Sequence, residues 1–372
     1  MDNLKQTPLH LACKCSSIKV FKLLVESNKL SLEHIYNNSY TTSPLHCACR
    51  TNTQNHIIAE NLLEKTIELK LKQTLENHLD FNLREKLINI LIPIVISRFE
   101  MTTEDIEQYI NEKEFILNKF EFIRIVDETN CYLKEIVNLQ DSFEKRPLQL
   151  AVERNYLDIT SVLFKFGALS ILYAPDRTLP IHIAAKTGSV PMFRLLLKHN
   201  SITFKTDGTM NNFFHLASFY NNFDFLKEAC DYFNQKFEEK NLYNDFKSAL
   251  ETINSDYLTP LFLAISKSNF NCVKVLFESM PNSKFYVDDF SRNIFHICCL
   301  HDSHSTFEYI IKFMDNNNMI EKDFKLNAEN NYENILDDSM HYGQINKTEG
   351  MMPSLQIQTY HIYHHKGKIT FF

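Results

Sequence analysis

The sequence predicts an all-α solenoid of stacked helix–turn–helix units, and three observations lead to this prediction. A six-residue motif close to T-P-L-H-x-A recurs along the chain. Most copies follow the previous one after 33 to 36 residues. A second apolar segment with helical spacing comes after the clear copies. Because one short helix pair cannot bury its own apolar face, we expect the pairs to stack on one another.

The copies keep a common phase with two interruptions. They read TPLHLA at 7–12, SPLHCA at 43–48, RPLQLA at 146–151, LPIHIA at 179–184, NFFHLA at 212–217, TPLFLA at 259–264 and NIFHIC at 293–298. The second positions are separated by 36, 103, 33, 33, 47 and 34 residues. The gap of 103 is close to three periods, and 47 is one period plus 14. Proline at the second position favours the first turn of a helix, where its missing N–H costs nothing.

A period of 33 that begins T-P-L-H-x-A is similar to the ankyrin repeat. The resemblance implies an ankyrin-repeat solenoid with short hairpin fingers, for example at Ala174–Arg177, which line a concave side where partners bind. It also implies that the histidine at the fourth motif position hydrogen-bonds backbone groups and ties neighbouring repeats. Recurrence at the period favours this role over a catalytic base, which would normally be singular. The histidines are His10, His46, His182, His215 and His296.

The phase divides the chain into four segments. Residues 1–53 hold two repeats. Residues 54–140 read as the second helix of repeat two, then a helical insertion with one or two degenerate repeats. Residues 141–342 continue the array, with an extended helix or long loop inserted near 231–251. Residues 343–372 show no helical period, and we expect an irregular tail there.

Composition argues against several classes of function. The net charge of −7 speaks against nucleic acid as a partner, because a duplex needs a basic face. With six glycines and no glycine-rich phosphate loop or catalytic signature, we expect no enzyme activity, no cofactor and no metal site. The longest apolar run, Leu87–Ile96, is ten residues, whereas a membrane span needs about 20. We therefore expect a buried helix there and no membrane span.

Nine cysteines, no C-x-x-C pair and no secretion signal favour reduced thiols and a cytoplasmic location. Three of them, Cys13, Cys15 and Cys49, lie beside Lys14 or Arg50. A nearby cation favours the thiolate, which is the nucleophile. These three are therefore the candidate reactive thiols.

The function expected from this architecture is protein interaction through the fingers. The candidate contact residues are the polar and aromatic residues of the expected fingers. They are Tyr173, Asp176, Arg177, Asp207, Asp256, Tyr257, Asp288, Asp289 and Arg292.

A sharper resemblance appears in the later copies. Thr206-Asp207-Gly208 before His215-Leu216-Ala217, then Ile253–Asp256 before Thr259-Pro260-Leu261, then Asp288–His296, occur in this order and near this spacing. This order resembles the cytosolic ankyrin array of ankyrin-type transient receptor potential channels. The resemblance implies a regulatory arm of a tetrameric cation channel at the cytoplasmic face of the plasma membrane, with channel subunits as partners. A stand-alone cytosolic adaptor that binds a protein on its concave face remains the alternative.

Overall fold

The computed structural model describes residues 6–27, 30–32, 42–51, 55–75, 81–97, 119–236, 238–280, 293–316, 362–365 and 368–371. It divides into two compact units, 1–297 and 298–372. In the first unit the described helices form the expected ankyrin-repeat solenoid.

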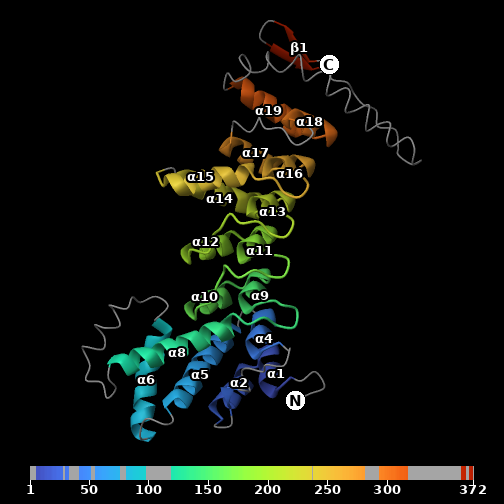
Figure 1. Cartoon of the computed structure of the whole chain (residues 1–372). Helices are drawn as coiled ribbons and strands as arrows, with labels where there is room; N and C mark the ends of the chain where they lie inside the picture. Colours follow the sequence, from blue (N-terminus) through green and yellow to red (C-terminus); the bar gives the residue numbers. More distant parts are fainter. Residues whose placement is uncertain are drawn as a thin grey trace. The chain divides into compact units, whose positions relative to one another are not determined.

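Six helix pairs build the first unit. The first helices are α1 (Pro8–Lys14), α4 (Pro44–Thr51), α9 (Pro147–Glu153), α11 (Pro180–Thr187), α13 (Phe213–Phe219) and α16 (Pro260–Ser266). The second helices are α2 (Ile18–Glu26), α5 (His56–Leu75), α10 (Leu157–Lys165), α12 (Val190–Lys198), α14 (Phe223–Gln235) and α17 (Phe270–Ser279). Each first helix packs on the next first helix, and each second helix on the next second helix, so two columns run side by side (Figure 1). We number these pairs as repeats one to six.

Side-chain caps begin three of the first helices, α1, α13 and α16. The Asn212 side chain accepts hydrogen bonds from the backbone N–H groups of Phe214 and His215, which caps α13. Thr7 and Thr259 cap α1 and α16 in the same way. After α1, α9, α11, α13 and α16, one residue takes a positive φ and reverses the chain into the second helix. These residues include Ser16, Asn155, Gly188, Asn221 and Ser268, with φ from 54° to 73°.

Within the described part of the gap of 103 residues, no additional repeat lies in the stack. Helix α4 packs directly on α9, and α5 packs directly on α10. The expected degenerate repeats therefore have no place between repeats two and three. Helices α6 (Phe81–Ser97) and α8 (Lys119–Val137) instead pack on α5 and on each other, beside the column (Figure 1). The sequence interpretation was misled because an insertion packed to one side can have the length of whole repeats.

The apolar run Leu87–Ile96 lies in α6, where Leu87, Ile88, Leu91 and Val95 are buried. The prediction of a buried helix is therefore confirmed for this segment. Among the described residues, no helix combines the length and the apolarity that crossing a membrane requires.

The second interruption also forms helices. Helix α14 is longer than α10, α12 and α17, and α15 (Lys240–Glu251) follows it and packs on both α14 and α16. The buried rings of Phe233 on α14 and Phe246 on α15 are stacked, with centroids 5.4 Å apart. The segment expected to be an extended helix or a long loop is thus the end of α14 followed by α15. The buried side chain of Phe246 adds α15 to the apolar core.

The seventh motif copy forms α18 (Ile294–Leu300), which begins in the first unit and ends in the second. The second unit also contains α19 (His304–Asn316) and a hairpin of β1 (Ile362–His365) and β2 (Lys368–Phe371). The strands are antiparallel, with Ile362 opposite Phe371 and His365 opposite Lys368. These described residues are strands rather than the irregular tail that we expected, since Ile, Tyr, Thr and Phe favour extended structure.

Candidate protein-interaction face

Four fingers of the first unit share one backbone conformation. They span 141–145, 174–178, 207–211 and 254–258. In each, the first residue's N–H donates to the carbonyl of the fifth, at 2.9 to 3.0 Å. The fourth residue has a positive φ of 57° to 60° in every finger. The segment Ala174–Arg177 therefore forms a finger as expected.

Side-chain oxygens at the base hold three of these fingers. The Asp207 carboxylate accepts the backbone N–H groups of Thr209 and Asn211, at 2.8 and 2.9 Å. Asp141 accepts two backbone N–H groups of its own finger in the same way, and so does the Asn254 amide oxygen. This local bonding is the reason that Asp and Asn favour turns. The fingers therefore have a fixed shape before any partner binds.

Neighbouring fingers are also joined to one another. The Gly208 N–H donates to the Asp176 carbonyl at 2.8 Å, and the Ser255 N–H donates to the Thr209 carbonyl at 3.1 Å. A Cβ added at Gly208 would lie 2.8 Å from the Asp176 carbonyl oxygen, so glycine permits this approach. Three successive fingers consequently form one connected ridge.

The finger tips expose large apolar side chains. Phe143 is 67% exposed, Met210 is 49% exposed and Tyr257 is 51% exposed. Met210 and Tyr257 occupy the same fourth position in successive fingers. Exposed aromatic and Met side chains on a rigid scaffold are typical of protein interfaces.

The structure distributes the predicted contact residues over different roles. Asp176, Arg177, Asp256 and Tyr257 lie exposed at finger tips. Tyr173 is half-buried under the guanidinium of Arg177 and the ammonium of Lys205, which lie 5.9 and 5.7 Å from its ring centroid. The Asp207 carboxylate accepts hydrogen bonds within its own finger, and its role as a contact residue stays a prediction. Asp288, Asp289 and Arg292 lie outside the described residues.

Three of the histidines at the fourth motif position, His46, His182 and His215, tie neighbouring repeats together, which confirms the expected structural role for these three. His215 accepts the Asn212 backbone N–H at Nδ1, 3.2 Å away, so Nε2 carries the proton and donates to the Leu258 carbonyl at 3.0 Å. His182 makes the same bonds to Leu179 and Lys205. In repeat three, Gln149 replaces the histidine and likewise bonds a backbone N–H and a carbonyl of the next segment.

Burial keeps these imidazoles neutral. It lowers the pKa of His46 and of His215 from 6.5 to about 4, and it lowers the pKa of His182. A neutral ring is what the bonding requires, because Nδ1 must accept a hydrogen bond while Nε2 donates one. His46, His182 and His215 are therefore part of the scaffold that joins the repeats. Among the described residues, no cluster of potential ligands is arranged to hold a metal ion.

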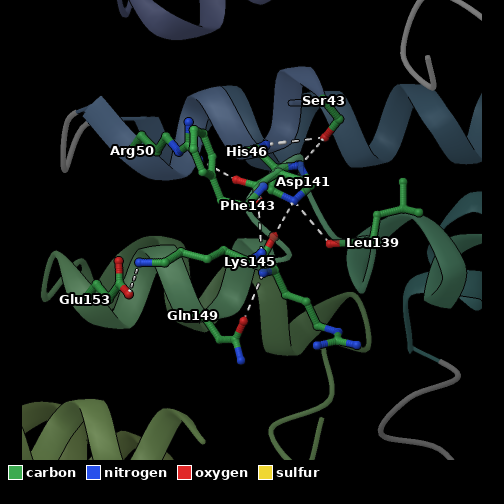
Figure 2. A network of polar contacts seen from close by, with 10 residues as sticks. Ser43, His46, Arg50, Leu139, Asp141, Phe143, Lys145, Gln149 and Glu153 are labelled. Atoms are coloured by element: carbon green, nitrogen blue, oxygen red, sulfur yellow. Dashed lines mark hydrogen bonds and ion pairs between the residues drawn. The ribbon is translucent and has the colours of Figure 1, made fainter. Parts of the chain in front are cut away.

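Repeats two and three are joined by a polar network around a buried carboxylate (Figure 2). Arg50, at the end of α4, pairs with Asp141, whose side chain is fully buried. His46 Nε2 lies 3.1 Å from both the Leu139 and the Lys145 carbonyl oxygens. The Arg50 guanidinium also lies 5.6 Å from the Phe143 ring centroid. Arg50 is thus held by the finger of the next repeat.

Repeats four to six present a different surface at the ends of their first helices. Lys186, Tyr220, Phe219 and Lys267 are exposed there and contact one another. We call these four residues the lysine–aromatic strip. The ammonium groups of Lys186 and Lys267 lie 5.4 and 4.7 Å from the ring centroids of Tyr220 and Phe219. The strip was not recognised in the sequence because its members come from three different repeats.

A ladder of asparagines, also missed from the sequence, connects repeats behind the fingers. Asn222, just before α14, donates its side-chain amide to the Ala185 carbonyl of the previous repeat at 2.6 Å. Asn269, just before α17, donates to Ser218 at 2.6 Å, and Asn55, just before α5, donates to Cys13 at 3.1 Å. Their common place before a second helix is the signal that would have identified them.

The candidate thiols differ in exposure. Cys13 and Cys49 are buried, and burial raises the pKa of both thiols, so the thiolate is disfavoured. The prediction that these two are reactive is therefore wrong, because burial outweighs the neighbouring cations. Cys15 is exposed, and its reactivity stays a prediction.

A family model described as ankyrin repeats (3 copies) matches residues 1–73 and 214–323. Among solved structures, the crystal structure of the human ASB11 ankyrin repeat domain matches with a TM-score of 0.44 and 17% identity, covering 77% of this chain and 89% of that chain. None of the curated proteins matches the chain. In residues 1–73 and 214–323 the chain is thus similar to ankyrin repeats.

Proposed function

We propose that this chain is a non-catalytic protein-interaction solenoid that binds a protein partner on its finger face. This face comprises the four described fingers and the exposed ends of the first helices. The observation that carries the proposal is the row of exposed apolar tips, above all Met210 and Tyr257, on fingers joined by backbone hydrogen bonds. A partner that covers this ridge gains apolar contact with little loss of backbone freedom, because the fingers are already ordered.

Substitution at the tips tests the proposal. We expect Met210→Glu with Tyr257→Glu to abolish recovery of the partners that the unchanged chain captures from its native cells. Val20→Glu with Leu23→Glu is the matched control, because these exposed apolar side chains lie on α2, in the other column. Unchanged recovery after the tip substitutions, or equal loss in the control, contradicts the proposal.

A finer assignment is that the solenoid is a cytosolic arm of an ankyrin-type transient receptor potential channel, with other channel subunits as partners. The ordered match between Thr206 and His296 supports it. Full-length transcript sequencing tests it: in-frame continuation into six apolar segments of about 20 residues supports the channel. Transcripts that all stop after Phe372 contradict it and leave the cytoplasmic adaptor.

A further inference from the structure

The lysine–aromatic strip is a continuous surface feature of repeats four to six. Between its two lysines, the Tyr220 and Phe219 rings lie edge to face, with centroids 5.0 Å apart. The rings are 42% and 43% exposed. The four side chains therefore form a row in the order Lys186, Tyr220, Phe219 and Lys267. The row crosses three adjacent repeats of one unit, at the ends of α11, α13 and α16.

Lys186 lies two residues after the end of its hexamer motif. In repeats two and three, the residue at this position lies beside a finger. The equivalent residue of repeat two is Arg50, which pairs with Asp141 at the base of the next finger. The equivalent residue of repeat three is Glu153, whose carboxylate lies 2.5 Å from the ammonium of Lys145 in its own finger. In repeats two and three, the charges of Arg50 and Glu153 are therefore neutralised by ion pairs within the protein.

In repeat four the residue at this position is Lys186, and in repeat six Lys267 follows this position by one residue. Lys186 and Lys267 form no ion pair within the described part of the chain. The strip contains no acidic residue, although the whole chain has a net charge of −7. A local excess of positive charge on an acidic protein attracts an acidic partner. The exposed rings between the two cations add a surface for an apolar side chain.

We propose that the lysine–aromatic strip binds an acidic peptide segment of a partner protein, with carboxylates at Lys186 and Lys267 and an apolar side chain on the Phe219 and Tyr220 rings. This inference rests on the proposed function and gives the chemistry of the partner. Two cations are few for a nucleic acid, whose binding depends on many phosphate contacts.

Fluorescence anisotropy with a labelled peptide EEDFLDEE tests the inference. We expect this peptide to bind the whole chain at low salt, and to bind at least tenfold more tightly than QQNFLNQQ or EEDGGDEE. Lys186→Glu with Lys267→Glu should weaken binding at least tenfold, and so should Phe219→Ala with Tyr220→Ala. The matched control is Lys198→Glu with Lys227→Glu, which makes the same charge change at exposed sites on second helices and should leave binding unchanged. Thermal unfolding of each variant verifies that it is folded.

Three outcomes overturn the inference: no binding of EEDFLDEE, equal binding of QQNFLNQQ, or an equal loss in the control variant. Tighter binding of a labelled single-stranded oligonucleotide than of the peptide, abolished by the strip substitutions, also overturns it. The experiment also distinguishes failure of this inference from failure of the proposed function. If the peptide does not bind while the Met210 and Tyr257 substitutions still abolish partner capture, this inference fails and the finger face remains the binding site.

Discussion

Arg50 and Asp141 form an ion pair although 91 residues separate them in the sequence. The pair joins the end of α4 to the finger that begins repeat three, across an insertion that packs to the side. Asp141 also accepts two backbone N–H groups of that finger. One buried carboxylate thus fixes both the shape of a finger and the continuity of the stack.

We expect Asp141→Ala to lower the free energy of unfolding by about 3 kcal/mol, because removing one partner of a buried pair leaves the other without compensation. Urea unfolding followed by circular dichroism measures the change. Glu228→Ala is the control, since it removes an exposed ion pair with Arg194 and should have little effect. An equally small effect of both substitutions would contradict a structural role for Asp141.

We expect the free energy of unfolding to fall as the pH is lowered from about 6.5 towards 4. Burial lowers the folded-state pKa of His46, His182 and His215, so the unfolded chain binds more protons in this range. Stability is therefore complete above pH 6.5, and each histidine contributes a slope of up to about 1.4 kcal/mol per pH unit below it. His182→Gln and His215→Gln should reduce the slope, since Gln149 fills the equivalent place in repeat three. An unchanged slope in both variants would show that these residues do not titrate on unfolding.

We expect Gly188→Ala to cost about 2 kcal/mol, because Gly188 has a φ of 73°, where an added Cβ is unfavourable. The added Cβ would also lie 2.6 Å from Asn222 Oδ1. In an Asn222→Ala background that contact is gone, and we expect the cost to fall to about 1 kcal/mol. Unfolding of the four species of this cycle measures the coupling. Strict additivity would show that the asparagine ladder does not approach Gly188.

We expect Cys15 to react with iodoacetamide in the folded protein well before Cys13 and Cys49. The latter two are buried, and burial raises the pKa of their thiols. Mass spectrometry of timed samples measures the three rates, and denatured protein gives the control in which they converge. Similar rates in the folded state would contradict the packing of repeats one and two.

Much of the fold could be predicted because ankyrin repeats are specified locally. The recurring motif indicated where first helices begin, and the finger at Ala174–Arg177 was recognised from its polar residues. The path of the insertion could not be predicted from spacing. Whether α4 packs on α9 or on a further repeat depends on which apolar helix faces fit together. The number of residues between two motif copies does not reveal this.

The candidate site was predicted less completely, for a related reason. Asp207 is a polar finger residue like Asp256, but its carboxylate is used by its own turn. Cys13 and Cys49 lie beside cations in sequence, yet the stacking of repeats buries both thiols. The lysine–aromatic strip exists only once α11, α13 and α16 lie side by side. The burial of a thiol and the grouping of surface side chains depend on contacts between repeats, and for that reason they could not be predicted from the sequence.

Photo-crosslinking from a finger tip tests the central claim most directly. A photoreactive phenylalanine analogue replaces Tyr257 in one sample and Leu23 in another, both exposed positions, and native cells expressing each are irradiated. We expect a discrete protein adduct from position 257 and none from position 23. Adducts from position 23 alone, or the same adducts from both positions, would contradict binding on the finger face.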